Sequence, residues 1–369
     1  MPEKKFKSQT NKRTFNLQMR KTLYYIMHWE QWNWLAKYIP IAPAWLWYCI
    51  RSRSLWFFTP SNPTLTFGGF FGESKREMYK QLPPKSFPTS IFISPSSSIK
   101  EIEQKISDHH LSYPIAVKPD VGMMGFMFRR IENKEQLYRY HKMMPVDYII
   151  QEHIDLPIEV SVFYYRFPGE RRGTITGFLK KEFLEVIGNG KSTLLELMTN
   201  YPRIAFRMQE MKSKHILRLH TVIPEGEVVR LSPALNLSRG GKLVSLAHEN
   251  DEKLLAVFDA ISNHAVHFYY GRYDIKCASV DELKVGLNFS ILEYNGCGAE
   301  PIHVYGNGLT LLQAYRILLQ HWSVLSRISM ENNKKGIRYW KNSSGYCFSK
   351  NAHRHFKRLK QLDATFQLN

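Results

Sequence analysis

The sequence has little cysteine, few acidic residues and no long apolar run. Its four cysteines are widely spaced and form no C-x-x-C pair, which excludes a disulfide scaffold and a cysteine-rich zinc module. Reduced thiols in a cytosolic compartment are therefore expected. The most apolar stretch, residues 38–50, is broken by Pro40 and Pro43 and is too short to span a bilayer. No apolar segment with a small-residue cleavage site follows the basic start closely, so no secretory signal is predicted.

Acidic residues are scarcest at the two ends of the chain. The 369 residues include 51 Lys and Arg against 32 Asp and Glu, a net charge of +19. Residues 1–60 and residues 327–369 each hold ten Lys or Arg and two acids, so the middle is nearly neutral. We expect a basic flexible tail over residues 1–20 and a basic C-terminal tail over 327–369. Such ends favour an anionic partner, or they serve solubility alone.

Tryptophan is concentrated in one segment. Six of the eight tryptophans lie between Trp29 and Trp56, together with Arg51 and Arg53. This pattern suits a membrane interface and also an aromatic lid packed on the protein body, with packing or partner contact slightly favoured. We predict that residues 21–58 dock on the body and also touch an anionic, lipid-rich surface. The protein is then cytoplasmic and peripheral at the inner face of the membrane, and nucleic acid is the less favoured partner.

The rest of the chain predicts an α+β fold with largely antiparallel strand neighbours. An apolar fraction of 44% supplies a core for two or more lobes. A Trp-rich region over residues 21–72 precedes a main domain over 73–326, whose smaller lobe covers about 112–155. Strands are predicted over residues 91–93, 115–118, 126–131, 148–152, 158–165, 174–178, 183–187, 273–276 and 289–294. Helices are predicted over 73–81, 99–110, 134–143, 251–270 and 309–325, with Gly271 ending the helix before it.

Two motifs suggest a nucleotide site. In the first, a strand delivers Lys118 to a loop that contains Gly122 and Gly125. A lysine beside such a loop can place an ammonium and backbone N–H groups around phosphates, although a plain turn has the same pattern. In the second, Glu159 opens an alternating strand seven residues after Glu152. A carboxylate there can accept hydrogen bonds from a ribose diol, or it is simply an exposed charge.

A third motif suggests a magnesium site. Arg272 and Asp274 lie two apart on one strand, and Glu293 and Asn295 lie two apart on another. Period-two spacing puts each pair on one face of its strand. If the strands pair, Asp274, Glu293 and Asn295 converge as oxygen ligands that suit Mg²⁺. Arg272 beside them could stabilise a phosphoryl group in transfer.

The order of these motifs resembles the ATP-grasp superfamily, most closely its D-alanine–D-alanine ligase type, over residues 75–325. The resemblance implies that ATP and Mg²⁺ (or Mn²⁺) are bound. It implies Lys75, with Lys80 as the fallback, and Lys118 as phosphate lysines before the loop of Asp120–Gly125. The adenine hinge, ribose carboxylate and metal ligands implied by the resemblance are Glu152, His153, Ile154, Glu159, Asp274, Glu293 and Asn295.

Two further stretches resemble amide-forming members of the same superfamily. Lys180 and Lys181 precede a glycine turn at residues 186–198, and only one of them can face the nucleotide if both lie on a strand. Arg239 lies in a loop with two glycines that could hold an acyl phosphate or a substrate carboxylate, or it is a solvated loop charge. With Arg272 it is the second candidate catalytic residue.

The resemblance implies a carboxylate–amine ligase that forms an amide through an acyl phosphate. The Trp-rich N-terminal region departs from the family, because it does not read as the usual βαβ substrate lobe. The carboxylate and amine substrates therefore have no visible recognition residues. Two alternatives remain: an ATP-grasp phosphotransferase acting on a hydroxyl or histidine, and a nucleotide-binding adaptor at an anionic membrane.

Overall fold

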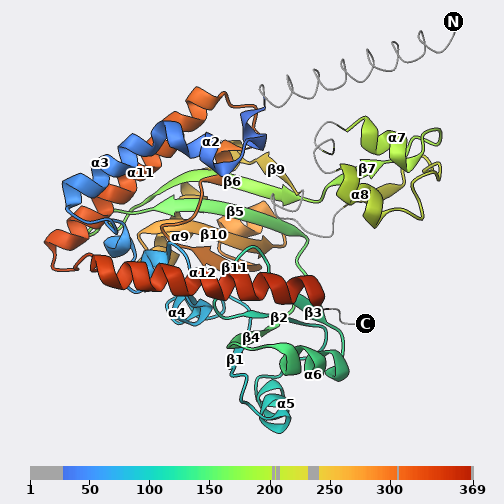
Figure 1. The fold of residues 1–369 in the computed structure, drawn as a ribbon, viewed down its shortest axis with the longest axis horizontal. Coiled ribbons are helices and arrows are strands. Elements are labelled where there is room, and N and C mark those ends of the chain that lie inside the picture. Colours follow the sequence, from blue (N-terminus) through green and yellow to red (C-terminus); the bar gives the residue numbers. More distant parts are fainter. Residues whose placement is uncertain (1–27, 202–203, 205–207, 232–240, 306, 367–369) are drawn as a thin grey trace, which may run out of the picture.

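The computed structural model describes residues 28–201, 204, 208–231, 241–305 and 307–366, and its two larger sheets are both antiparallel (Figure 1). The smaller sheet has four strands in the order β1-β4-β2-β3. Their bounds are Ser90–Ile93 for β1, Ile115–Pro119 for β2, Arg129–Ile131 for β3 and Tyr148–Glu152 for β4. Helices α5 (Ile99–Asp108) and α6 (Lys134–Met143) pack with this sheet around one apolar core. The lobe therefore begins near residue 90, earlier than the sequence suggests.

The larger sheet has five strands in the order β11-β10-β5-β6-β9. Its core is shared with α9 (Glu252–His264), α10 (Val280–Lys284) and α4 (Lys75–Tyr79). The strands are β5 (Ile158–Tyr165), β6 (Thr174–Glu182), β9 (Lys242–Ser245), β10 (Tyr270–Cys277) and β11 (Phe289–Asn295). Mixed helices and antiparallel sheets confirm the predicted α+β class.

Local signals in the sequence explain several element boundaries. Ser98 caps α5 and exchanges hydrogen bonds with Glu101 in a capping box, as its position predicts. The predicted helix over 251–270 is too long, because Val266 adopts a left-handed φ of 55° just after the helix ends. Gly271 instead lies inside β10, where an added Cβ would come within 2.4 Å of the Asn295 carbonyl oxygen. Close strand packing, and not a helix end, requires glycine there.

Residues 184–231 form a small unit with its own core, which the sequence did not separate from the main domain. Figure 1 shows this unit beside the end of the large sheet, around α7. It contains a two-stranded sheet and two short helices. Its elements are β7 (Glu185–Ile187), α7 (Leu194–Thr199), α8 (Met208–Lys214) and β8 (Val228–Arg230).

The Trp-rich segment forms short helices that pack on the body. Trp45 contacts the ring of Trp322 in helix α11 (Leu311–Lys334), with ring centroids 5.1 Å apart. Phe57 and Phe58 are fully buried in the same aromatic cluster. The helical turns of this segment are η1 (Trp29–Gln31), α2 (Trp34–Tyr38), η2 (Ile39–Ile41), α3 (Ala42–Ser52), η3 (Thr59–Ser61) and η4 (Thr66–Gly69). The predicted tail at residues 1–20 lies outside the described residues.

The C-terminal segment is a packed helix and not a tail. Helix α12 (Asn342–Thr365) is 24 residues long and runs past both lobes in Figure 1. Its first half joins the aromatic cluster through Phe348, and its last turns bury Leu359 in the core of the small lobe. Asp363 forms an ion pair with Arg129 of β3 at 2.8 Å. These apolar positions recur at helical spacing, but the many basic residues around them make the pattern hard to recognise in the sequence.

Burial of Leu359 generates a stability prediction. Leu359→Ala should lower the free energy of unfolding by about 2–5 kcal/mol, because it leaves a cavity in the small lobe. Urea denaturation measures the change, with Lys360→Ala at the neighbouring exposed position as the control. Equal stability of the two variants would show that α12 does not pack there.

Candidate functional site

Strand register brings the predicted motifs onto one face of the large sheet. Asp274 of β10 lies opposite Glu293 of β11 on one side and opposite Ser161 of β5 on the other. Arg272 lies opposite Asn295, so both predicted pairs converge as their spacing requires. The face therefore combines the neighbouring strands β10 and β11 with β5, which lies more than a hundred residues earlier in the sequence.

Asp274 is the centre of a buried polar network. Arg272 donates to both of its carboxylate oxygens at 3.1 Å, and Lys181 lies 3.2 Å from it. Ser161 donates its hydroxyl at 2.5 Å, and Asn295 donates its amide at 3.1 Å. Burial alone would raise the pKa of Asp274, but the two cations and these donors hold it well below its usual range. Asp274 is therefore an ionised carboxylate at neutral pH.

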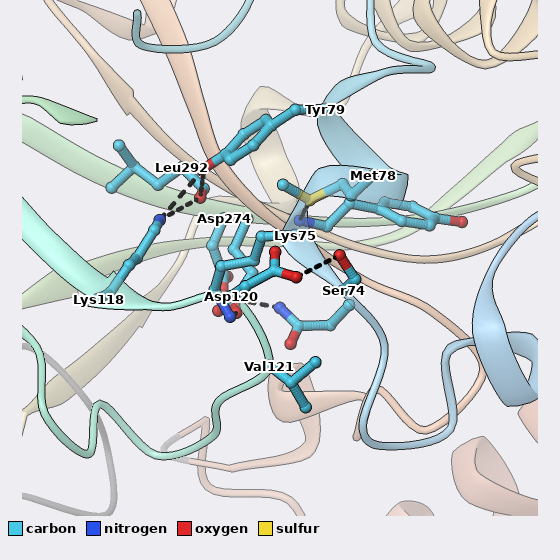
Figure 2. Close-up of polar contacts among 12 residues, drawn as sticks. Ser74, Lys75, Met78, Tyr79, Lys118, Asp120, Val121, Asp274 and Leu292 are labelled. Carbon is cyan, nitrogen blue, oxygen red and sulfur yellow. Dashed lines mark hydrogen bonds and ion pairs between the residues drawn. The ribbon is translucent and has the colours of Figure 1, made fainter. Parts of the chain in front are cut away.

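The two predicted phosphate lysines both lie near Glu293, beside this network. Lys75, at the start of α4, lies 3.3 Å from Glu293 and is almost fully buried. Burial opposes ionisation of Glu293, yet Lys75 and Lys118 together lower its pKa. Figure 2 shows Lys118 pointing to neutral oxygens, the Tyr79 hydroxyl at 3.2 Å and the Leu292 carbonyl at 3.1 Å.

Lys118 has an unusual environment for a lysine. Burial, with the charge of Lys75 as the second cause, lowers its pKa to about 7. The hydrogen bonds described for Lys118 go to the uncharged oxygens of Tyr79 and Leu292. The nearby Glu293 carboxylate raises the pKa of Lys118, but by less than burial and Lys75 lower it. An anion bound between Lys75 and Lys118 would reduce the repulsion between the charges of the two lysines.

The structure distinguishes the two consecutive lysines of β6. Lys181 lies 2.9 Å from Glu159 and joins the Asp274 network, whereas Lys180 pairs with Glu182 at 3.1 Å. Burial opposes the charge of Lys181, but Asp274 and Glu159 raise its pKa above the usual value. Lys181 is therefore the lysine that faces the site.

The predicted hinge lies where the small sheet joins the large one. Glu152 ends β4 and is exposed, and Thr89 donates its backbone N–H to the carboxylate at 3.3 Å. His153 is half-buried, which lowers its pKa. The Ile154 carbonyl accepts a hydrogen bond at 2.8 Å from Lys276, which lies opposite Glu159 on β10. Lys276 thus connects the hinge, through its hydrogen bond to Ile154, with the strand position opposite the ribose candidate Glu159.

The glycine loop follows β2, as predicted. Gly125 has a φ of 70°, a conformation in which glycine is unstrained, and Gly122 packs against Pro119. Asp120 at the start of the loop accepts from the Ser74 hydroxyl at 2.6 Å and from the Arg76 backbone at 3.0 Å (Figure 2). It fixes the loop to α4. Arg239, the other loop candidate, lies outside the described residues.

Sequence reasoning missed several residues that complete the face. Ser161 is two residues after Glu159, so period-two spacing could have found it. Glu300 could not be found this way, because it follows β11 in an irregular loop. Its backbone carbonyl accepts from Arg272 at 3.1 Å, and its carboxylate accepts from the hydroxyls of Tyr38 and Tyr305.

The carboxylates of the face fit one divalent cation shared with phosphates. No group of three or more His, Cys, Asp or Glu side chains gathers as a metal site within the described ranges. Asp274 and Glu293 supply two carboxylates at opposed register positions, and Asn295 supplies an amide oxygen. Mg²⁺ is usually held by one or two carboxylates together with substrate phosphates and water, so this donor set is sufficient.

Comparisons with known proteins give distant structural neighbours. No known family matches the sequence, and no curated protein matches it either. The chain is similar to D-alanine–D-alanine ligase from Bacillus anthracis, at 12% identity and a TM-score of 0.41 over 71% of this chain and 68% of that chain. It is also similar to a bifunctional glutathione synthetase from Pasteurella multocida, at 12% identity and a TM-score of 0.40 over 71% of this chain and 38% of that chain. A third neighbour is the D-alanine–D-alanine ligase from Coxiella burnetii, at 9% identity and a TM-score of 0.40 over 78% and 64% of the two chains.

The low pKa of Lys118 predicts a pH effect on stability. Between about pH 7 and the ordinary lysine value of 10.5, the unfolded chain holds a proton on Lys118 that the folded protein lacks. Stability therefore rises with pH in this window. Urea denaturation should show a shallower rise for Lys118→Met than for the parent, whereas the exposed control Lys357→Met should follow the parent. Parallel profiles for all three proteins would contradict the depressed pKa.

Proposed function

We propose that this protein is an ATP-dependent carboxylate–amine ligase of the ATP-grasp type. The observation that carries the proposal is Lys118, a buried lysine near Lys75 whose described hydrogen bonds go to neutral oxygens. A polyphosphate would bring negative charge to both lysines and favour their protonated forms. The order of the sequence motifs then assigns the nucleotide to the face that carries Asp274 and Glu293.

Each part of the face has a role in this proposal. Lys75 and Lys118 hold phosphate oxygens, and the backbone of residues 152–154 faces the adenine. Glu159 accepts from the ribose and is positioned by Lys181. Mg²⁺, held by Asp274, Glu293 and Asn295, neutralises charge on the phosphates when it is bound.

Arg272 is the residue proposed to act on the group in transfer. It is fixed by Asp274 on one side and by the Glu300 carbonyl on the other. A guanidinium held in this way can stabilise negative charge that develops on a phosphoryl group without reorganising. Positioning and charge stabilisation then suffice, and no side-chain nucleophile is needed.

The proposed reaction has two steps. A substrate carboxylate oxygen forms a bond to the γ-phosphorus of ATP, and the bond from that phosphorus to the ADP oxygen breaks. The amine nitrogen then attacks the acyl carbon, the bond from carbon to the phosphate oxygen breaks, and the amine loses a proton. The products are an amide, ADP and inorganic phosphate.

The substrate end of the site is built from an unexpected source. Tyr38, from the Trp-rich segment, donates its hydroxyl to Glu300 at 2.5 Å, and Tyr305 donates to the same oxygen. The Tyr38 ring stacks on Trp322, with ring centroids 6.2 Å apart. In this proposal the N-terminal segment lines the substrate end of the site in place of a βαβ substrate lobe.

The direct test is release of ADP from ATP in the presence of pooled carboxylates and pooled amines, with mass detection of products. A ligase should release ADP together with a new amide only when both pools are present. Phosphorylation of one pool without amide formation would favour the phosphotransferase alternative. ATP binding with no product from any pool would favour the adaptor.

The metal carboxylates give a prediction that needs no substrate. Asp274→Asn and Glu293→Gln should each weaken ATP binding in the presence of Mg²⁺ about tenfold or more, because each removes a ligand charge. Isothermal titration calorimetry with and without Mg²⁺ measures the affinity. Asp281→Asn, an exposed acid on α10, is the matched control. The metal assignment is wrong if either site variant keeps the Mg²⁺ dependence of the parent.

The ribose assignment is tested with a second nucleotide. Glu159→Gln should weaken binding of ATP more than binding of an analogue that lacks the ribose hydroxyls, by about 1.5–3 kcal/mol in free energy. Calorimetric titration of both nucleotides gives the difference. Equal losses for the two would mean that Glu159 acts only by pairing with Lys181, at 2.9 Å.

A further inference from the structure

Helix α3 is apolar on two sides. One side packs on the body: Cys49 is buried, and Trp45 contacts Trp322 and Phe57. The other side faces solvent, where a helix of a soluble domain normally places charge. Its exposed stripe consists of Pro43, Leu46, Trp47 and Ile50, at the i, i+3, i+4 and i+7 positions of one helix face.

The preceding elements also carry exposed apolar side chains. Trp34 and Leu35 of α2 and Ile39 of η2 are 67%, 57% and 63% exposed, comparable with Trp47 at 59% and Ile50 at 69%. We call this set, with Pro43 and Leu46, the α2–α3 face. Scattered exposed apolar residues are ordinary, but a continuous set on adjacent turns indicates a contact surface.

The neighbouring helix shows that this face is not a general property of the molecule. Helix α11 contacts α3 and is exposed along much of its length. Apart from Leu312 in the first turn, its exposed residues are all polar: Gln313, Arg316, Gln320, Ser323, Arg327 and Lys334. These two adjacent helices thus present different chemistries to solvent: the exposed side of α11 is mainly polar, whereas α3 carries an apolar stripe.

The charged residues within the segment that carries the face have one sign. The sequence from residue 31 to residue 72 contains no Asp or Glu, whereas Lys37, Arg51 and Arg53 are cations. Arg51 and Arg53 are exposed at the end of α3. Residues 1–27, which precede α2 directly in the chain, add seven Lys or Arg and one acid.

We propose that the α2–α3 face docks the protein on an anionic lipid surface. Trp47 and Trp34 would lie at the headgroup level with Leu46 and Ile50 below it, and Arg51 would contact lipid phosphates. Within the described residues no helix is long and apolar enough to cross a bilayer, so the contact is a lateral one.

The charge pattern favours lipid over the other occupants. A second copy of the chain would place the same cations against one another in a two-fold interface, which is repulsive. Nucleic acid is bound through phosphates and stacked bases, and it gives no partner to Leu46 or Ile50. Lipid accommodates both the apolar stripe and the surrounding cations.

The experiment is co-sedimentation of the full chain with vesicles. We expect binding to an equal mixture of phosphatidylcholine and phosphatidylglycerol, with weaker binding to phosphatidylcholine alone. Binding should also weaken at high salt, because exposed charges are screened. The double variant Trp47→Glu/Ile50→Glu should reduce the affinity about tenfold or more, because it places two acids in the contact. Leu217→Glu, at a leucine that is 95% exposed in the 184–231 unit, should bind as the parent does.

The substituted positions are exposed, so the substitutions should leave the fold intact. Thermal unfolding of each variant checks this. The proposal is overturned if the parent does not bind anionic vesicles, or if the double variant binds as the parent does. Equal binding to both vesicle types at every salt level also overturns the anionic assignment. If the parent forms a dimer, the double variant is monomeric and the parent does not bind vesicles, then a second copy of the chain is the occupant of the face.

Discussion

The site depends on the pairing of β10 with both β5 and β11. This register places Asp274 between Ser161 and Glu293, and it brings Arg272 beside Asn295. A buried carboxylate is costly without donors and cations, and here Arg272 and Lys181 supply them. The cations that hold Asp274 ionised are those that the proposed reaction uses, so the structure of the site and its chemistry share one network.

Helix α12 is a second constraint on the same site. It packs on the aromatic cluster through Phe348 and on the small lobe through Leu359, so it holds the two lobes in a fixed relation. His355 also contacts the carbonyl of Val121 in the glycine loop at 2.7 Å. Lys118 belongs to the small lobe and Asp274 to the large sheet. Their relative position thus depends partly on α12, a segment far from both in the sequence.

Sequence reasoning succeeded where a pattern has a local cause. Period-two spacing predicted that Asp274 and Glu293 would converge, and the predicted helix over 99–110 begins where α5 begins. It failed where the cause is tertiary. The helix before Gly271 ends early because Val266 turns left-handed, and the C-terminal helix is held by a core that only the small lobe provides. Glu300 and Tyr38 meet across 262 residues of chain, and no spacing rule reports such a contact.

The two proposals meet at α2. This five-residue helix carries Trp34 on the exposed face and Tyr38 in contact with Glu300, next to Arg272. A surface bound at Trp34 would therefore lie one helical turn from Tyr38, the side chain that we propose for the substrate end of the site. Substrates that partition into a lipid surface would reach such a site without leaving it. The Trp-rich segment can replace a βαβ substrate lobe in this arrangement, because the surface itself limits which carboxylates or amines arrive.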